Sequence, residues 1–298
     1  MDPEKNTGLM KTLVVVNPAS GVTNKKGAEA KILAGLDPTR FDARVVFTEG
    51  PEHAVQLTRQ ALEDGVRVVI AVGGDGTINE IGQVLAGTDA ILGIIPAGSG
   101  NGLARHLKIP MRMNRAIGLI NRFKVIRIDT AIVNERVFIS TAGMGYDAHV
   151  AKKMTKARKR GFLTYFRIIS EEYVKYKSRK YVLEIDGRKL ERKAFLITLA
   201  NSSQFGYNTS ISPESRLDDG FIDVCVVRKI PFLLLPFYVP RLYSRSFHKT
   251  HYIEIIKGKN VNITRKKGKS MHFDGDYYPM GKSLSMTINP SSLNVIIP

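Results

Sequence analysis

The sequence contains one cysteine and no tryptophan. A single cysteine cannot form an internal disulfide, so the chain is not a disulfide-stapled secreted domain and fits a reducing compartment. Cys225 lies among apolar, mostly β-branched residues, which predicts a buried strand thiol and not a nucleophile. The six histidines show no metal-ligand spacing, and no Ser/His/Asp set of a hydrolase can be argued.

Long apolar runs are also missing. No uninterrupted run reaches the ~20 residues that a membrane-spanning helix needs, and the longest candidate, residues 230–240, contains three prolines. The first eleven residues are polar and lack the apolar region of a signal peptide. These absences predict a cytoplasmic protein that associates with membranes only peripherally.

The composition predicts a folded protein with a basic surface. The 298 residues fit two domains, and 43% hydrophobic with 24% charged residues allows each domain its own core. The 45 basic and 27 acidic residues give a net charge of +18. Such a surface predicts an anionic partner: nucleic acid, nucleotide phosphate or an anionic lipid surface.

Strands and helices alternate in the first part of the chain and then give way to strands. Strands are expected at residues 13–16, 43–48, 67–72 and 91–95, with helices at 25–36, 53–64 and 77–85. Their alternation predicts an α/β domain with a parallel sheet over residues 1–125. Residues 126–298 read mainly as strands, interrupted by helices at 165–176 and 232–243, which predicts a mostly antiparallel β-sandwich domain.

A glycine-rich loop follows the third strand. In open α/β sheets ligands bind at the carboxyl ends of the strands, where glycines let backbone N–H groups approach phosphates. Asp75 in this loop would need a cation between its carboxylate and a phosphate, which suggests Mg²⁺. The alternative is a glycine turn capped by Thr77. The loop consists of Gly73, Gly74, Asp75, Gly76 and Thr77.

Residues 17–21 and 96–101, after the first and fourth strands, are also rich in glycine, hydroxyl and amide residues. Neither contains the Gly-Lys-Ser/Thr of a Walker loop, and no G-x-G-x-x-G follows the first strand. We therefore expect a nucleotide site of another family.

These loops resemble those of the diacylglycerol kinase catalytic-domain family, which includes bacterial lipid kinases and sphingosine and ceramide kinases. The resemblance covers nearly the whole chain, and its markers are residues 16–21, 73–80, 95–101, 217–220 and 274–276. It implies a lipid-substrate domain after residue 125, with ATP bound in a cleft between the two domains. By motif position the nucleotide site would be lined by Asn17, Thr48, Gly73, Gly74, Asp75, Gly76, Thr77, Ile78, Asn79 and Ser99.

The resemblance also assigns the acidic loops. Asp219, with the backbone carbonyls of Arg216 and Phe221, would bind a structural Mg²⁺, and Asp75 would organise phosphates and metal. Asp276 or the neighbouring Asp274 would act as general base, although the family usually carries Glu where this chain has Asp276. A plain hairpin turn remains the alternative for both loops.

The basic runs at residues 152–160 and 175–180 suggest docking on an anionic membrane surface. No nucleic-acid recognition motif is found, and a homodimer remains open. We therefore expect an ATP-dependent kinase of a membrane lipid, with a diacylglycerol or sphingoid-like acceptor. A kinase of a soluble acceptor such as NAD, or a non-catalytic nucleotide- or polyanion-binding protein, remains open.

Overall fold

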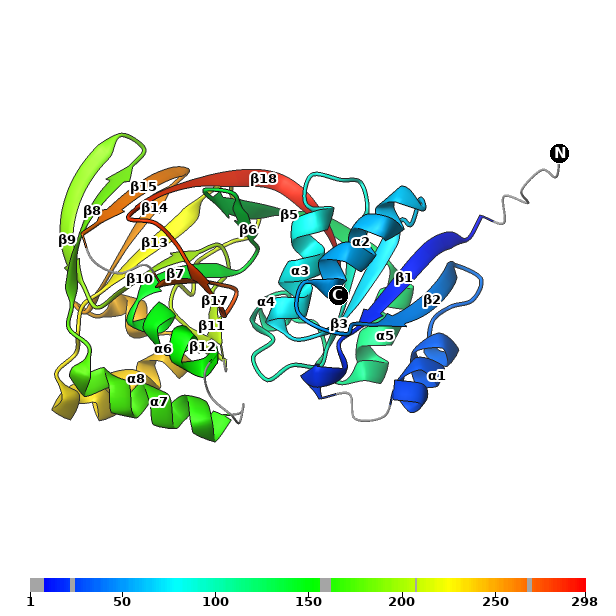
Figure 1. Cartoon of the computed structure of the whole chain (residues 1–298), viewed down its shortest axis with the longest axis horizontal. Helices are drawn as coiled ribbons and strands as arrows, with labels where there is room; N and C mark the ends of the chain where they lie inside the picture. The colour runs from blue at the N-terminus through cyan, green and yellow to red at the C-terminus, as the bar shows by residue number, and fades with distance from the viewer. Residues whose placement is uncertain (1–7, 22–24, 156–161, 207, 267–269) are drawn as a thin grey trace. The chain divides into compact units, whose positions relative to one another are not determined.

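The computed structural model describes residues 8–21, 25–155, 162–206, 208–266 and 270–298 (Figure 1). The chain forms two compact units. Unit 1 runs to Ile128 and includes the C-terminal segment Ser292–Pro298, and unit 2 is Asp129–Ser291. The predicted division at 125/126 falls three residues before this one, but the return of the last seven residues to unit 1 was not predicted.

Unit 1 contains the expected parallel sheet. Its strand order is β2-β1-β3-β4, and the end of the last strand lies parallel to β4, with Asn294 opposite Ile91. The strands are β1 (Met10–Val16), β2 (Phe41–Phe47), β3 (Val68–Gly73) and β4 (Ile91–Pro96). The helices are α1 (Lys25–Gly35), α2 (His53–Glu63), α3 (Asp75–Leu85), α4 (Gly102–His106) and α5 (Met113–Arg122).

The sheet of unit 1 is covered by helices on both faces. β3 is buried along its whole length, as its apolar, β-branched sequence predicts for a central parallel strand. α2 packs against α3, and α1 packs against α5. Right-handed crossovers in this strand order put the two pairs on opposite faces. All four strands therefore end at one edge, where the glycine-bearing loops begin.

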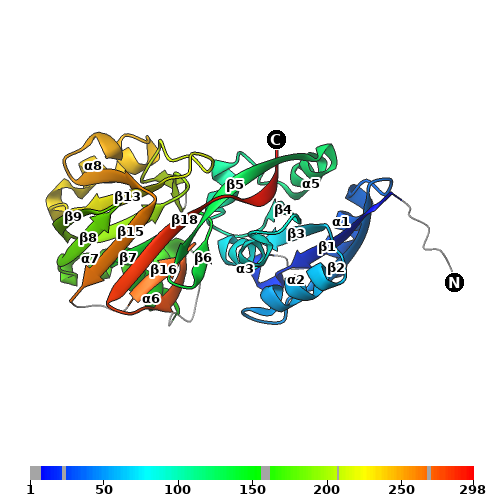
Figure 2. The same ribbon diagram turned by 90° about the horizontal axis from the view of Figure 1, so that it is seen from above.

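Unit 2 is a sandwich of two antiparallel sheets, as expected. Figure 2 shows β18, β15, β8 and β9 side by side in the first sheet. That sheet contains β5 (Lys124–Val133), β6 (Arg136–Phe138), β8 (Arg179–Ile185), β9 (Arg188–Ala194), β15 (Asn260–Arg265) and β18 (Ser283–Ile297). The second contains β14 (Ile253–Gly258), β13 (Ile222–Val227), β10 (Leu196–Ala200), β7 (Thr141–Gly145), β16 (Ser270–Phe273) and β17 (Asp276–Pro279). A short pair, β11 (Gln204–Gly206) and β12 (Thr209–Ser210), stands apart.

The core of unit 2 forms between the two sheets. Alternate residues point inward, so that Val261 and Ile263 of β15 meet Met144 and Val224 of the other sheet in one buried cluster. The other face of the second sheet carries Cys225, whose burial raises the pKa of its thiol. That face is covered by α6 (Tyr146–Thr155), α7 (Phe162–Lys175), α8 (Leu235–Tyr243) and η3 (Phe247–Lys249), and the short η2 (Phe232–Leu234) precedes α8. No helix in the described ranges is long and apolar enough to span a bilayer.

Candidate active site

Backbone hydrogen bonds hold the loops of unit 1 together at the carboxyl edge of the sheet. The N–H of Asn17, after β1, donates to the carbonyl of Val72 at 2.9 Å. The N–H of Thr48 donates to Val16 at 2.9 Å, and that of Ala97 donates to Gly73 at 2.8 Å. The sheet register thus brings the predicted segments after β1, β2, β3 and β4 to one edge.

Asn17 joins the loop after β1 to the first turn of α3. Its Oδ1 accepts from the N–H of Ala19 at 2.9 Å and caps η1 (Pro18–Ser20), while its Nδ2 donates to Thr77 Oγ1 at 3.0 Å. Thr77 is buried, so its hydroxyl supports the loop from within. A Cβ on Gly73 would lie 2.5 Å from Thr77 Oγ1, which explains the glycine there.

The loops after β3 and β4 touch through glycines. A Cβ on Gly98 would lie 2.4 Å from the Cα of Gly74, and a Cβ on Gly100 would lie 2.7 Å from Asp75 Oδ2. Because the contact of Gly98 is with backbone atoms that cannot move aside, residue 98 must be glycine for the two loops to meet, and a side chain at residue 100 would have to displace the carboxylate of Asp75. The result is two segments of bare backbone beside the N-terminus of α3, where the helix dipole favours an anion.

Asp75 and Asn101 fix this arrangement. Asp75 begins α3, and its Oδ1 accepts from the N–H of Gly102 at 2.6 Å. Asn101 adopts a left-handed conformation, φ 53°, and its side chain donates to the carbonyl of Gly98 and accepts from its N–H at 2.7 and 3.0 Å. Asn101 is not among the predicted site residues, although it belongs to the predicted loop at residues 96–101.

The other predicted nucleotide residues differ in accessibility. Thr48 is buried, and Ser99 is exposed. Ile78 packs in the core at 1% exposure, and its N–H is bonded to the carbonyl of Gly74 within α3. Ile78 therefore supports the loop and presents no polar group at its surface. Gly76 and Asn79 are half-buried on the first turns of α3.

The acidic loop of unit 2 is the turn of the β16–β17 hairpin. Asp274 and Gly275 have φ of 48° and 98°, as in the type I′ turns that favour Asp-Gly. The carboxylate of Asp274 is buried and accepts from three backbone N–H groups at 2.8–2.9 Å, those of Ile139, Ser140 and Thr141. Asp276, the first residue of β17, is exposed.

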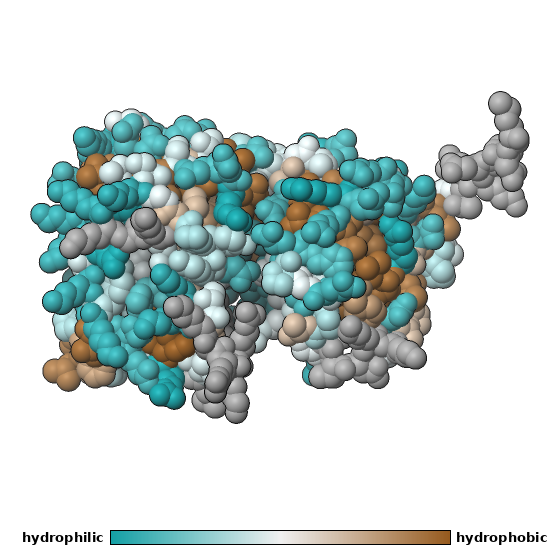
Figure 3. All heavy atoms as spheres, viewed as in Figure 1, coloured by the Kyte–Doolittle hydropathy of each residue, from teal (hydrophilic) through white to brown (hydrophobic). Residues whose placement is uncertain are grey.

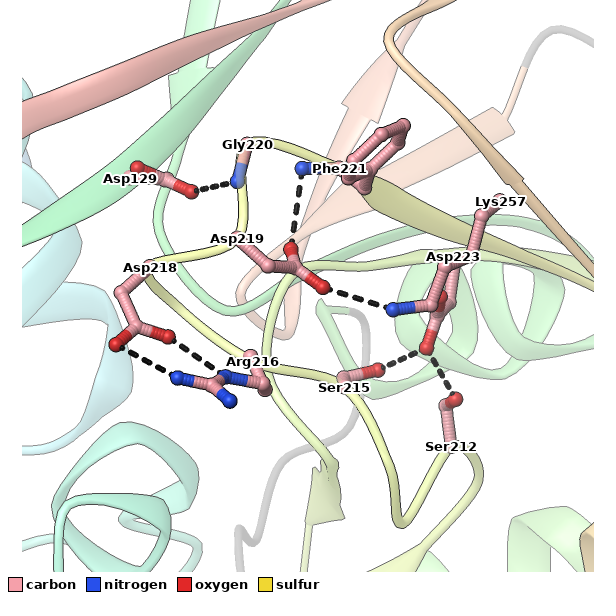
Figure 4. A network of polar contacts seen from close by, with 10 residues as sticks. All are labelled: Asp129, Ser212, Ser215, Arg216, Asp218, Asp219, Gly220, Phe221, Asp223 and Lys257. Atoms are coloured by element: carbon pink, nitrogen blue, oxygen red, sulfur yellow. Dashed lines mark hydrogen bonds and ion pairs between the residues drawn. The ribbon is translucent and has the colours of Figure 1, made fainter.

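The loop at residues 216–221 precedes β13 and forms the network of Figure 4. Asp219 Oδ1 accepts from the N–H of Phe221 at 3.1 Å, and Oδ2 pairs with the Lys257 ammonium at 2.7 Å. The hydrogen bond to Asp219 raises the pKa of Lys257. Asp218 turns away and pairs with Arg216 through both of its oxygens.

Asp129 anchors that loop from β5. Its side chain is almost completely buried and accepts from the N–H of Gly220 at 2.8 Å and from that of Ser291 at 2.7 Å. Its own N–H donates to the carbonyl of Leu217 at 2.6 Å. The carboxylate thus ties the loop at Gly220 and the last residue of unit 2, Ser291, to β5.

Hard cations take several oxygen ligands, yet the described part of the chain holds no group of three or more His, Cys, Asp or Glu residues that could bind a metal. Asp219 Oδ2 already pairs with the Lys257 ammonium, so a cation binding at this oxygen would compete with Lys257.

Comparisons with known proteins agree with this architecture. A family model described as the diacylglycerol kinase catalytic domain matches residues 11–133, and one described as the YegS C-terminal NAD kinase beta sandwich-like domain matches residues 140–297. The chain is 28% identical to a diacylglycerol kinase of Staphylococcus saprophyticus over 269 residues, covering 89% of this chain and 88% of that one. Identity to a diacylglycerol kinase of Staphylococcus carnosus is 26% with the same coverage.

Solved structures share the fold. A diacylglycerol kinase from Bacillus anthracis superposes with a TM-score of 0.78 at 24% identity, covering 97% of each chain. At 24% identity this similarity shows a shared fold and nothing further.

Proposed function

This chain belongs to the diacylglycerol kinase catalytic-domain family of lipid kinases, and from that premise we propose that it transfers the γ-phosphoryl group of ATP to the hydroxyl of diacylglycerol. The name shared by its relatives supports this acceptor. A sphingoid base and NAD are the competing acceptors.

The observation that carries the proposal is the glycine contact between the loops after β3 and β4. The contact of Gly98 with Gly74 exposes backbone beside the N-terminus of α3, and that environment suits the phosphates of a nucleotide. Asn17 and Asp75 would hold the surrounding loops in place through Thr77 and Gly102. Asn79 and Ser99 would offer polar groups to the nucleotide.

Asp276 is the proposed general base. Its carboxylate accepts the proton of the lipid hydroxyl as the oxygen–phosphorus bond to the γ-phosphorus forms. The bond between the γ-phosphorus and the bridging oxygen breaks, and ADP leaves. Asp274 is then a positioning residue, because its three backbone hydrogen bonds hold the turn that carries Asp276.

We propose Mg²⁺ as the divalent cation of the reaction, where it would neutralise charge on the phosphates. Asp75 lies within the glycine-rich loop after β3, and its carboxylate would bind this Mg²⁺. At the other loop, Asp219 with the carbonyls of Arg216 and Phe221 would bind Mg²⁺ only in competition with Lys257.

An acceptor panel tests the proposal. Purified protein, MgCl₂ and γ-labelled ATP are incubated separately with diacylglycerol in mixed micelles, with a sphingoid base and with NAD. The proposal predicts that label passes to diacylglycerol and gives phosphatidate. Label on NAD or on the sphingoid base alone would overturn the assignment of the acceptor.

A further inference from the structure

The outer surface of η2 and α8 is apolar where a polar face is expected. Five side chains form this surface, which we call the apolar ridge: Phe232, Leu233, Leu234, Phe237 and Val239. Leu233 is 84% exposed and Phe237 is 70% exposed. Figure 3 shows apolar atoms at the surface over the end of unit 2 where Figure 1 draws α8. Contiguous apolar surface of this kind marks an interaction site.

The apolar ridge is not needed for the core of unit 2. Leu235, Tyr238 and Leu242 form the inner face of α8 and already pack against the buried cluster on the second sheet. An amphipathic surface helix would place polar residues opposite this face. α8 instead carries Phe237 there, so it presents apolar side chains on two sides.

A basic groove lies beside the apolar ridge. Arg228 and Lys229 line it, and only Ile230 and Pro231 separate them from the first residue of the apolar ridge, Phe232. Lys229 Nζ donates to the carbonyls of Val174 and Tyr176 at 3.2 and 2.7 Å, which joins the groove to the end of α7. The Val174 side chain at this end of α7 is 64% exposed. The other lining residues of the groove include Lys177, Arg192, Lys193 and Glu254.

The charge of this region indicates which kind of partner would bind there. Residues 224–253 contain no Asp or Glu, whereas Arg228, Lys229, Arg241, Arg245 and Lys249 are all basic. In the groove Arg192 pairs with Glu254, and Lys177, Lys193 and Arg228 are exposed. A second copy meeting this surface about a two-fold axis would bring the same basic residues against one another, which opposes self-association. An anionic lipid surface offers both acyl chains and negative phosphates.

We propose that this surface docks the protein on an anionic phospholipid bilayer. The apolar ridge enters the boundary between headgroups and acyl chains, and the groove holds the phosphates of neighbouring headgroups. The inference rests on the lipid-kinase function, since the substrate resides in the bilayer. Beyond that function, the inference specifies which surface and which residues contact the membrane. Part of the basic run expected from the sequence, residues 156–160, lies outside the described residues.

Vesicle sedimentation tests the docking surface. The probe is a vesicle of equal parts phosphatidylglycerol and phosphatidylcholine, with phosphatidylcholine vesicles as the uncharged comparison. The double variant Leu233→Asp/Phe237→Asp should bind anionic vesicles at least about tenfold more weakly, because burial of each side chain is lost and a charge is added. Leu33→Asp is the matched control, since Leu33 is a 40% exposed apolar residue on α1 of unit 1.

A groove variant, Lys177→Glu/Arg228→Glu, tests the electrostatic contribution of the groove separately from insertion of the apolar ridge into the bilayer. It should weaken binding to anionic vesicles and flatten its dependence on NaCl, while binding to phosphatidylcholine vesicles stays unchanged. Wild-type-like vesicle binding by the double variant of the apolar ridge overturns the proposal. A second result would also overturn it: the wild type is a dimer, and the double variant is a monomer that still binds vesicles as the wild type does. The apolar ridge would then be an interface between two copies of the chain.

Activity on a dispersed substrate keeps the two proposals apart. With water-dispersed short-chain diacylglycerol, the double variant of the apolar ridge should turn over at the wild-type rate. Loss of that activity together with vesicle binding would contradict a pure docking role. A wild-type protein that binds anionic vesicles but phosphorylates no diacylglycerol would leave the docking surface standing and remove the acceptor assignment.

Discussion

Asp274 and Asp276 lie two residues apart on one hairpin, and the chain turns the first carboxylate inward and the second outward. Asp274 is 8% exposed and bonded to three backbone N–H groups, and Asp276 is exposed at the start of β17. The sequence made both candidates for the base. Asp274 holds the turn through these three bonds, and Asp276 is the general base that we propose.

Substitution of each carboxylate by its amide separates stability from catalysis. Asp276→Asn should lower kcat by about 10²-fold or more and change the free energy of unfolding by less than about 0.5 kcal/mol. Asp274→Asn should lower the free energy of unfolding by about 2–3 kcal/mol, because an amide accepts fewer of the three N–H groups. Kinase assays and urea unfolding measure the two effects. Equal loss of stability in both variants would refute the division of roles.

The contact of Gly74 with Gly98 predicts a specific defect in nucleotide binding. Gly98→Ala places a Cβ 2.4 Å from the Cα of Gly74, so the loops after β3 and β4 must separate. The Kd for ATP, measured by calorimetry, should rise about tenfold or more. Gly118→Ala on α5 is the matched control, since a Cβ there meets nothing within 4 Å. Unchanged affinity in Gly98→Ala would disconnect these loops from the nucleotide.

The ion pair of Lys257 with Asp219 predicts how the loop before β13 responds to Mg²⁺. Lys257→Met removes the competing ammonium and leaves Asp219 in place. The gain in Tm on adding MgCl₂ without nucleotide should therefore be larger in Lys257→Met than in the wild type. It should vanish in Lys257→Met/Asp219→Asn. The same Tm gain in all three proteins would place the responding cation elsewhere.

Glu172 on α7 predicts a pH-dependent contribution to stability. Hydrogen bonds from His149 at 2.7 Å and from Lys153 hold the pKa of its carboxyl below 4.5. A lowered folded-state pKa gives stability that is present above the unfolded value and is lost as pH falls through the folded value. Glu172→Gln should thus cost about 1 kcal/mol at pH 7, and the difference should shrink below pH 4.5.

Urea unfolding of wild type and Glu172→Gln between pH 7 and pH 3 makes this measurement. Glu171→Gln serves as control, because Glu171 pairs with Arg167 on the exposed side of the same helix. A difference between wild type and Glu172→Gln that grows toward acid pH would contradict the sign of the shift.

Local sequence patterns predicted most of the fold, but they could not predict which strands far apart in the sequence pair with each other. The alternation of strands and helices in residues 13–95 was sufficient for the parallel sheet, because each element buries its own apolar pattern. The return of Asn294 beside Ile91 could not be predicted, since nothing local specifies a partner 203 residues away. α5 was missed although Ala116, Ile117 and Ile120 have helical spacing and are buried.

In the candidate site too, the position of the loops could be predicted from the sequence, but the contacts of individual side chains could not. Glycine-rich loops after parallel strands predict a phosphate site by position alone, and the register brought them to one edge. The sequence could not show that Asp274 is buried and Asp276 exposed, because the N–H groups that bind Asp274 belong to Ile139 and its neighbours, more than 130 residues earlier. It also could not pair Asp219 with Lys257, which lies on the neighbouring strand 38 residues later.

The central claim is that Asp276 activates a diacylglycerol hydroxyl for attack on ATP. The most direct test follows ATP and diacylglycerol by mass spectrometry with wild type, Asp276→Asn and the stable Gly118→Ala protein side by side. The account predicts one phosphatidate for each ADP in wild type and Gly118→Ala, and at least about 10²-fold slower formation of both products in Asp276→Asn. Phosphatidate formed at the wild-type rate by Asp276→Asn would contradict it.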